Sequence, residues 1–469
     1  MRRTKLVCTI GPACDSEEML TELVRAGMNV ARVNFSHMDS DYHRNLIRRI
    51  KKVREKLETP VAILQDLQGP KIRIGKIATG NVWLERGAPF VLTSSPVTGD
   101  AHAATVSLLN LHEEVTAGQR ILLADGMIEL VVEQIDPPDV RCRVVVAGTL
   151  SSHKGVNLPA SHLDVDSLTE KDRVDLKVGL EERVDAVALS FVRSGKDVEA
   201  LQSAIRDAGA RIPVIAKVEK PQAVDNIDEI LALADGVMIA RGDLGVEIDL
   251  ERVPLVQKMI IAKANAIGKP VITATQMLVR MVDNPRPTRA ETADVANAIL
   301  DGTDAVMLSE ETAVGAYPLE AVRMMDRIAL AVESSVDETK FRGDASDYPN
   351  VNDAISRSSY NVARGTGAGA IITPTWSGST ARLVSRFRPR QPIIAPSPNQ
   401  ETVQFLSFCW GVVPLSIPPA DTIDDQLRYS LEAACKAGCV QKGQLVVITG
   451  GSPLHVAGTT NFIKVDRIE

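Results

Sequence analysis

Short runs of β-branched and other apolar residues recur along the chain, separated by stretches with helical periodicity. Continuous apolar runs of this length are typical of strands buried on both faces, as in parallel sheets. The predicted strands are 5–10, 29–35, 61–67, 186–191, 213–218, 236–240, 270–275 and 305–308. Helices are predicted between most of them, for example at 16–26, 42–57, 169–179, 197–208 and 253–267. Eight strands alternating with helices predict a (β/α)8 TIM barrel, with an open doubly wound sheet as the alternative.

One long interval breaks this alternation. From residue 69 to about 167 there is no helical periodicity, and β-like runs lie between Gly, Pro and Asp turns. These runs are 81–84, 90–93, 120–123, 128–132 and 140–147. The pattern predicts an all-β domain inserted after the third barrel strand. An insertion at a barrel loop is placed to act as a lid over an active site.

After about residue 336 the chain changes to an acidic linker and then to a new βα rhythm. A helix at 351–364 precedes predicted strands at 370–373, 392–395, 411–414, 445–449 and 461–465. The complete prediction is an α/β protein with three domains. The TIM barrel comprises 1–69 and 168–336, the inserted β-barrel-like lid 70–167, and a C-terminal α/β regulatory domain 337–469.

Composition and charge narrow the class of protein. The 469 residues carry a net charge of −7 and are 45% apolar, so we expect a soluble protein whose partners are neither nucleic acid nor membrane. The charged N-terminus is followed by only five residues before Gly11, too short for a signal peptide. The six cysteines form no CxxC motif, which favours the reducing cytoplasm and no structural zinc. Cys435 and Cys439, four apart on a predicted helix, are expected to be buried thiols.

Polar residues gather where the predicted barrel strands end. Active sites of (β/α)8 barrels lie at the C-terminal ends of the strands, and alternate residues of a strand point the same way. Arg32, Asn34 and Ser36 are therefore expected to project together, and so are Lys217 and Glu219. The other strand ends carry Asp66, Arg241, Asp243, Thr275, Ser309 and Glu311.

These residue types fit phosphoryl transfer. Glu219 and Asp243 on neighbouring strands suit Mg²⁺, which favours one or two carboxylates with waters and substrate oxygens. Arg32 and Lys217 supply positive charge beside them, and phosphoryl transfer needs cations where charge spreads over the phosphoryl oxygens. The alternative for any one of these residues is a surface ion pair or a salt bridge in the barrel core.

Nine motifs, in order along the chain, resemble those of the pyruvate kinase family. They are TIGPA (9–13), ARVNFSH (31–37), DLQGPKIR (66–73), KGVNLP (154–159), AKVE (216–219), ARGDLGVE (240–247), TATQML (273–278), NPRPTRAE (284–291) and DGTDAVMLS (301–309). The resemblance covers essentially the whole chain. The family's fold, a barrel with an inserted β-domain and a C-terminal α/β domain, agrees with the prediction from the apolar pattern.

The resemblance implies transfer of phosphate from phosphoenolpyruvate to ADP, giving pyruvate and ATP in the last step of glycolysis. It implies that Arg32 clamps phosphate, that Lys217 is the cation at the transferring phosphoryl and developing enolate, and that Thr275 takes part in proton delivery. By position, the motifs assign substrate contacts to Arg32, Gly242, Asp243, Thr275 and Ser309, nucleotide contacts to Asn34, His37, Arg73 and Lys154, and Mg²⁺, or alternatively Mn²⁺, to Glu219 and Asp243. Arg73 and Lys154 would meet the nucleotide or the phosphoryl group as the lid closes, and a closed lid excludes water that competes with ADP.

The chain departs from the family pattern at the site of the monovalent cation. Many members bind K⁺ through positions matching Asn34, Ser36, Asp66 and Leu67, and usually read Asp-Thr-Lys-Gly-Pro-Glu there. This chain carries Leu67, Gln68 and Lys71 in place of Thr, Lys and Glu. We interpret the Lys71 ammonium as replacing the charge of K⁺, so K⁺ is not expected to be required. The alternative is a solvent-facing Lys71, since most lysines are exposed.

In the C-terminal domain, hydroxyl residues follow a strand and open a helix, a pattern that matches the family's effector-phosphate loop. The residues concerned are Thr375, Ser377, Gly378, Ser379 and Thr380. Because the second effector segment, 450–455, lacks an obvious basic residue for a bisphosphate, we expect a sugar monophosphate. An ordinary N-cap without a ligand is the alternative. The family also implies a homotetramer.

Two other functions compete with the phosphotransferase. A metal-dependent barrel lyase acting on pyruvate enolates would also use two carboxylates, Mg²⁺ and an Arg, but it needs no second phosphate site such as Arg73 and Lys154. A sugar-phosphate sensor with a decayed barrel would have lost residues such as Lys217 and Thr275, which are intact.

Overall fold

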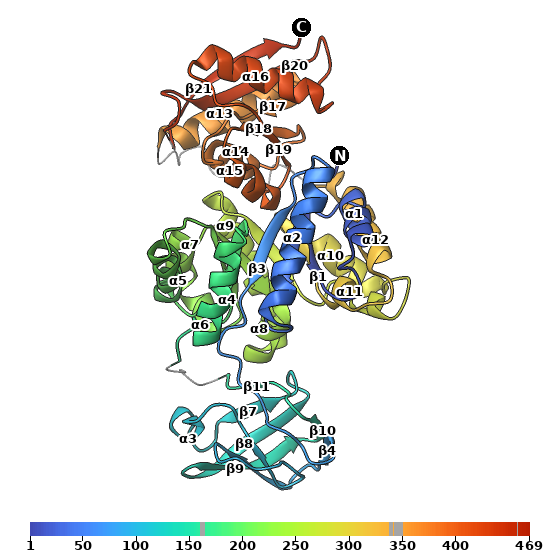
Figure 1. Ribbon diagram of the computed structural model, residues 1–469, viewed down its shortest axis with the longest axis vertical. Coiled ribbons are helices and arrows are strands. Elements are labelled where there is room, and N and C mark those ends of the chain that lie inside the picture. The colour runs from blue at the N-terminus through green and yellow to red at the C-terminus, as the bar shows by residue number, and fades with distance from the viewer. Residues whose placement is uncertain (160–164, 337–340, 342–349, 457) are drawn as a thin grey trace.

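The computed structural model describes residues 1–469 except 160–164, 337–340, 342–349 and 457. Within these residues, eight parallel strands close into a barrel in the order β1-β16-β15-β14-β13-β12-β3-β2 (Figure 1). The strands are β1 (Lys5–Ile10), β2 (Val30–Asn34), β3 (Ala62–Asp66), β12 (Ala186–Leu189), β13 (Val214–Val218), β14 (Gly236–Ala240), β15 (Val271–Ala274) and β16 (Ala305–Leu308). The barrel prediction is confirmed, and the open sheet is wrong because β1 pairs with both β2 and β16.

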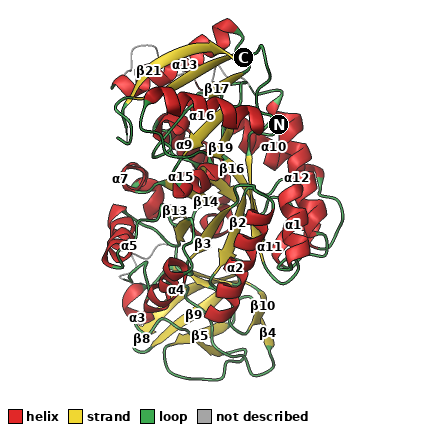
Figure 2. Ribbon diagram, turned by 45° about the horizontal axis from the view of Figure 1, so that its top comes forward, coloured by secondary structure: helices red, strands yellow, loops and turns green. Residues whose placement is uncertain are grey.

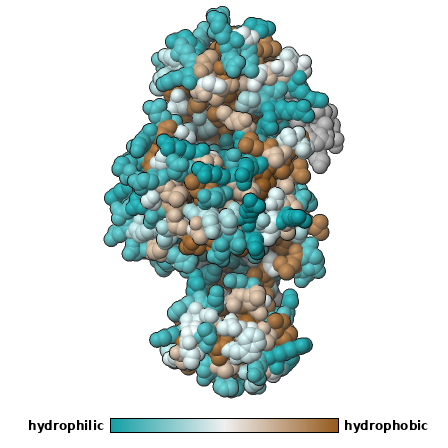
Figure 3. All heavy atoms as spheres, turned by 90° about the vertical axis from the view of Figure 1, so that its right-hand side faces the viewer, coloured by the Kyte–Doolittle hydropathy of each residue, from teal (hydrophilic) through white to brown (hydrophobic). Residues whose placement is uncertain are grey.

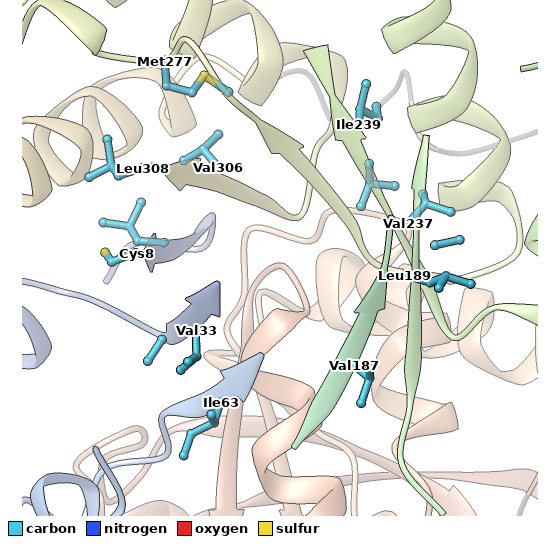
Figure 4. Close-up of a cluster of buried hydrophobic side chains, with 14 of the residues drawn as sticks. Cys8, Val33, Ile63, Val187, Leu189, Val237, Ile239, Met277, Val306 and Leu308 are labelled. Atoms are coloured by element: carbon cyan, nitrogen blue, oxygen red, sulfur yellow. The ribbon is translucent and has the colours of Figure 1, made fainter. Parts of the chain in front are cut away.

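Alternate residues of the barrel strands form two separate cores. Side chains such as Cys8, Val33 and Ile63 point outward and pack beneath the helices (Figure 4). Their neighbours in sequence, such as Val7 and Leu64, belong to a second cluster inside the barrel. This inner register continues to Arg32, Asp66 and Lys217, since each lies two residues beyond an inner apolar position. The strand period of two therefore delivers charged side chains to the carboxyl end of the barrel interior.

Helices surround the barrel, and several begin at sequence-encoded caps. Ser16 accepts from Met19 N, and Thr169 and Thr288 form capping boxes with the third residue of their helices. The helices are α1 (Glu17–Arg25), α2 (Ser40–Lys56), α4 (Glu170–Glu181), α5 (Gly195–Asp207), α6 (Pro221–Asp225), α7 (Ile227–Leu233), α8 (Arg241–Glu247), α9 (Val253–Ala266), α10 (Arg289–Asp301), α11 (Glu310–Ala313) and α12 (Pro318–Glu333), with 3-10 turns η1 (Leu250–Arg252) and η2 (Val279–Val282).

The inserted domain is built from strands around its own apolar core, as predicted. In its described residues a six-stranded sheet runs β11-β7-β8-β9-β5-β6, beside the pair β10-β4. The elements are β4 (Asn81–Leu84), β5 (Pro89–Thr93), β6 (Ala103–Thr105), β7 (Arg120–Leu123), β8 (Ile128–Asp136), β9 (Asp139–Val146), β10 (Gly148–Ser151), β11 (Val156–Asn157) and the short helix α3 (Leu111–Glu114). The short strands β6, β10 and β11 escaped the prediction. Figure 3 shows a narrow waist between this domain and the barrel.

The C-terminal domain is a helix-covered sheet in the order β19-β18-β17-β20-β21 within the described residues (Figure 2). Its elements are α13 (Val351–Thr366), β17 (Ala370–Ile372), α14 (Ser379–Ser385), β18 (Ile393–Ser397), α15 (Gln400–Phe405), η4 (Leu406–Phe408), β19 (Val412–Ser416), α16 (Ile423–Lys436), β20 (Leu445–Gly451) and β21 (Thr460–Arg467). Only β21 is antiparallel among these. Phe405 and Phe408 join the cluster inside the barrel, so this domain closes the barrel end opposite the charged side chains.

One expectation in this domain is wrong. Cys435 is exposed and Cys439 is only partly buried. The helix ends at Lys436, and the sequence continues into a turn at Gly438, so the two thiols do not share a helical face.

No helix within the described part of the chain is long and apolar enough to cross a membrane.

The domain boundaries remain a proposal. Residues 160–164 precede the second predicted boundary, and most of the predicted acidic linker, 337–340 and 342–349, lies outside the described residues. We place the boundaries at 69/70, 167/168 and 336/337, because the cluster under the barrel helices, the lid cluster and the two C-terminal clusters each fall within one of these domains. The cluster inside the barrel is the exception, since it includes Phe405 and Phe408.

Candidate active site at the carboxyl ends of the barrel strands

Three strand ends meet in one buried ionic network. From β2, Arg32 donates through Nε to Asp66 Oδ2 at 2.6 Å and through Nη1 to Thr9 Oγ1 at 2.9 Å. From β13, Lys217 Nζ lies 3.2 Å from Asp66 Oδ1. Asp66, at the end of β3, is fully buried, and burial raises its pKa, but the charges of Lys217 and Arg32 outweigh that effect and lower it. The carboxylate therefore holds both predicted phosphate-binding cations at one point.

Lys217 is held from three sides. Its Nζ donates to Ser190 Oγ at 2.7 Å and lies 2.9 Å from Glu219 Oε1. The Ser190 hydroxyl in turn donates to Leu67 O at 2.6 Å, and this bond orients the oxygen that accepts from Lys217. Burial alone would lower the pKa of Lys217, but Asp66 and Glu219 raise it above its ordinary value. Both carboxylates thus favour the charged form of the ammonium at the mouth of the barrel.

The two predicted metal ligands fit a hard divalent cation. Burial raises the pKa of Glu219, and the negative charge of Asp243 adds to that effect against the opposing charge of Lys217. Asp243, in the first turn of α8, lines the cavity between barrel and lid, and no partner is recorded for its carboxylate in the described residues. In the same part of the chain, no three His, Cys, Asp or Glu side chains cluster as metal ligands. Two carboxylates suit Mg²⁺, which retains waters and substrate oxygens.

A second group surrounds Thr275, directly after β15. Its hydroxyl donates to Ala274 O at 2.6 Å and accepts from Gly242 N at 2.7 Å. A Cβ at Gly242 would lie 3.4 Å from Thr275 Oγ1, an ordinary van der Waals contact, so this approach does not by itself require a glycine. The amide of Gly242, a residue expected to contact the substrate, thus donates to Thr275 here. Ser309 Oγ, after β16, is buried and has no hydrogen-bond partner among the described residues.

Two of the predicted nucleotide residues lie at the end of β2 and on the loop that follows it. Asn34 Oδ1 accepts from Ser36 N at 3.1 Å, and the exposed His37 follows on the same loop. Partial desolvation and the charges of Arg73 and Lys71 lower the pKa of His37. These cations therefore lie close to His37.

The two lid cations lie on adjoining segments of the hinge, which are joined by an isolated β-bridge. Arg73 pairs by a β-bridge with Gly155, the residue after Lys154, and donates to His153 O at 3.2 Å. Lys154 is exposed. The structure thus brings together two basic residues that are 81 positions apart in the sequence.

Of the four monovalent-cation positions, Asp66 and Leu67 are buried, and Asn34 and Ser36 form a local turn. In the described residues, the recorded partners of the Asp66 carboxylate are Arg32, Lys217 and Ser190. Lys71 lies in the wall of the cavity between barrel and lid, shared with Asp243. The effect of Lys71 on cation dependence remains a prediction.

Sequence reasoning missed a second buried ion pair at the hinge. Lys220 Nζ donates to Glu247 Oε1 at 2.6 Å, and the same oxygen accepts from Asn157 Nδ2 at 2.9 Å. Asn157 belongs to the lid strand β11 and Glu247 to the barrel helix α8, so this contact joins the two domains. Ser190 was also missed, although it follows β12 and the rule of polar strand ends would have found it.

The predicted effector loop lines a separate cavity in the C-terminal domain. Gly378, with φ of 80°, donates to Thr375 Oγ1 at 3.0 Å and begins α14 with Ser379. Thr380 Oγ1 lies 2.6 Å from Thr460 Oγ1. The cavity is lined by the four hydroxyl residues of the predicted loop and by Thr460, but Gly378 is not part of its wall. Trp376 and His455 also line it, and their rings meet edge to face at 4.8 Å.

In comparisons with known proteins, two models of one protein family match this chain, one in its N-terminal part and one in its C-terminal part. The family model described as "Pyruvate kinase, barrel domain" matches residues 1–322, and "Pyruvate kinase, alpha/beta domain" matches residues 353–466. The pyruvate kinase of Clostridium acetobutylicum is 45% identical over 100% of both chains. Pyruvate kinase 2 of Synechocystis sp. is 48% identical over 100% of this chain and 80% of its own. A pyruvate kinase of Staphylococcus aureus is 46% identical over 100% and 81%.

Proposed function

Because the chain belongs to the pyruvate kinase family and is therefore a phosphotransferase, we propose that it transfers the phosphoryl group of phosphoenolpyruvate to ADP, giving pyruvate and ATP. One observation supports the proposal most strongly. The Lys217 ammonium is buried at the barrel mouth, 2.9 Å from Glu219 and 3.2 Å from Asp66, with Arg32 on the other oxygen of the same aspartate. This arrangement preorganises positive charge where phosphoryl oxygens and an enolate would develop negative charge.

The roles follow from this placement. Arg32 holds the phosphate of phosphoenolpyruvate, and Lys217 contacts the transferring phosphoryl group and the enolate oxygen. The substrate carboxylate accepts hydrogen bonds from the backbone amides around Gly242. There it displaces the Thr275 hydroxyl, which accepts from Gly242 N in this structure. After transfer, the enolate C2–O⁻ becomes a carbonyl as C3 takes a proton from a water held by Thr275 and Ser309. The hydroxide that this leaves takes a proton from bulk solvent, so the step consumes one solvent proton.

Glu219 and Asp243 would hold Mg²⁺, with Mn²⁺ as a substitute, because Asp243 faces the cavity and interacts with Glu219, whereas the third carboxylate, Asp66, pairs with Arg32 and Lys217. When bound, the ion neutralises charge on the phosphoryl oxygens. Asn34, His37, Arg73 and Lys154 bind the nucleotide at the opening between barrel and lid. Closure of the inserted domain excludes water, and water would otherwise accept the phosphoryl group in place of ADP.

Three finer proposals concern regulation, ions and assembly. A sugar monophosphate binds in the C-terminal cavity, its phosphate held by Thr375, Ser377, Gly378, Ser379 and Thr380, and raises activity. K⁺ is not required, because Lys71 supplies positive charge at the same side of the site as Asp243. The assembly is a homotetramer, as the family resemblance implies.

The test is pyruvate formation from phosphoenolpyruvate and ADP with Mg²⁺ and without K⁺. We expect turnover that depends on all three components, with one ATP formed per pyruvate. A protein that forms no ATP, even after K⁺ and sugar phosphates are added, would overturn the proposal. Release of phosphate without ATP formation would also overturn it.

A further inference from the structure

Thr275 has a backbone conformation that its residue type rarely adopts. Its φ is 66°, and Gln276 follows with φ of 55°. A β-branched residue in this left-handed region is an outlier, and such outliers persist only where the surroundings enforce them. Thr275 therefore needs structural support to present its hydroxyl as it does.

The Arg241 guanidinium supplies this support from one side. It donates through Nη2 to Thr275 O at 2.8 Å and through Nε to Ala274 O at 3.3 Å. Ala274 O is also the acceptor of the Thr275 hydroxyl. A planar fork of donors can hold two successive carbonyls in fixed geometry, whereas an ammonium acts as a point charge.

Asp294 orients this guanidinium. Its carboxylate oxygens lie 2.7 Å from Arg241 Nη1 and 2.7 Å from Nη2, and the Arg241 side chain is only 10% exposed. Asp294 lies on α10 and does not itself follow a barrel strand. On the other side of the loop, Glu311 accepts from Leu278 N at 3.0 Å. The loop carrying Thr275 is thus held at both ends by charged side chains.

We propose that Arg241 and Asp294 are positioning residues for proton delivery, which hold Thr275 in the conformation that protonates the enolate. The inference rests on the proposed function, in which Thr275 and a water serve the step after phosphoryl transfer. Loosening the pair should slow the proton step more than ATP formation. Enolpyruvate that is not protonated on the protein leaves the site and converts to pyruvate in solution.

Two rates separate the steps. ATP formation from phosphoenolpyruvate and ADP reports phosphoryl transfer. Deuterium incorporation at C3 of pyruvate in ²H₂O, with Mg²⁺ and ATP present, reports proton removal at C3, the reverse of enolate protonation. For Arg241→Lys, we expect exchange to fall about tenfold or more, since small misplacements of a reacting group cost that much, while ATP formation falls less than about threefold.

Asp294→Asn keeps the shape of the pair, so it decides the question if Arg241→Lys does not fold. It should lower exchange relative to ATP formation by roughly threefold or more, as expected for a weakened orienting contact. Asp228→Asn is the matched control, since Asp228 pairs with Lys263 at 2.6 Å on exposed helices, and it should change neither rate. Equal losses in both rates, or no loss in either, would overturn the inference. A wild-type protein that forms no ATP would instead overturn the proposed function, and the inference with it.

Discussion

Replacing Lys217 by Met tests the centre of the proposed mechanism. Met is close to Lys in length and fills the buried space, so the change removes the charge and little else. Nζ now contacts Ser190 at 2.7 Å, Glu219 at 2.9 Å and Asp66 at 3.2 Å. Loss of a preorganised cation at a transferring phosphoryl group should lower kcat by roughly 10³-fold or more, equivalent to about 4 kcal/mol of barrier.

Stability should fall as well, because one member of a buried ionic network is removed. Such a loss costs about 3–5 kcal/mol when it strands a buried charge. Asp66 keeps its contact with Arg32, while Glu219 keeps only its hydrogen bond from Phe191 N. We therefore expect a loss of about 3 kcal/mol in the free energy of unfolding, the lower end of that range. The pKa of Glu219, already raised by burial, should rise further without its cation.

The assay compares kcat and KM for phosphoenolpyruvate in wild type, Lys217→Met and Lys5→Met. Lys5 is the matched control, because it is also a buried barrel lysine, but its Nζ donates to Val412 O at the opposite end of the barrel. The loss in Lys217→Met should lie mainly in kcat, as for an interaction made in the transition state. A loss below about tenfold, or an equal loss in Lys5→Met, would refute the reasoning.

Three further predictions concern ions, effectors and pH. Replacing tetramethylammonium chloride with KCl at constant ionic strength should leave turnover unchanged, and a many-fold rise would contradict the assignment of Lys71. At sub-saturating phosphoenolpyruvate, a sugar monophosphate should raise the velocity and Thr380→Val should remove the rise; a flat response of the wild type across a panel of sugar phosphates would reject the C-terminal site. Burial lowers the pKa of Lys5 to about 8 from its ordinary 10.5, so the unfolded chain binds more protons between these values and the stabilising contribution of Lys5 is lost as pH falls through about 8. Denaturant titrations from pH 7.5 to 10 should show the unfolding free energy of wild type rising relative to Lys5→Met, and parallel pH profiles would contradict this.

The fold could be predicted because its main signals are local. Each barrel strand is a short apolar run within one residue or two of its observed bounds, such as 236–240, and the buried strands alternate with capped helices. The weakly apolar lid strands β6, β10 and β11 have two to four residues each, too few for a period of two to stand out. The exposure of Cys435 was missed because a sequence pattern that predicts a helix does not show which of its residues face the core.

The sequence by itself determined the barrel, the insertion, the C-terminal domain and the residue types available for catalysis, because apolar period and strand-end position are properties of neighbouring residues. Tertiary structure alone decided which of those residues meet. Arg241 and Asp294 are 53 positions apart, and Asn157 and Glu247 are 90 apart, yet each pair shares a hydrogen bond. These contacts form only when the barrel closes and brings distant segments together. The strained backbone of Thr275 has the same origin, because tertiary packing overrides the local conformational preference of the residue.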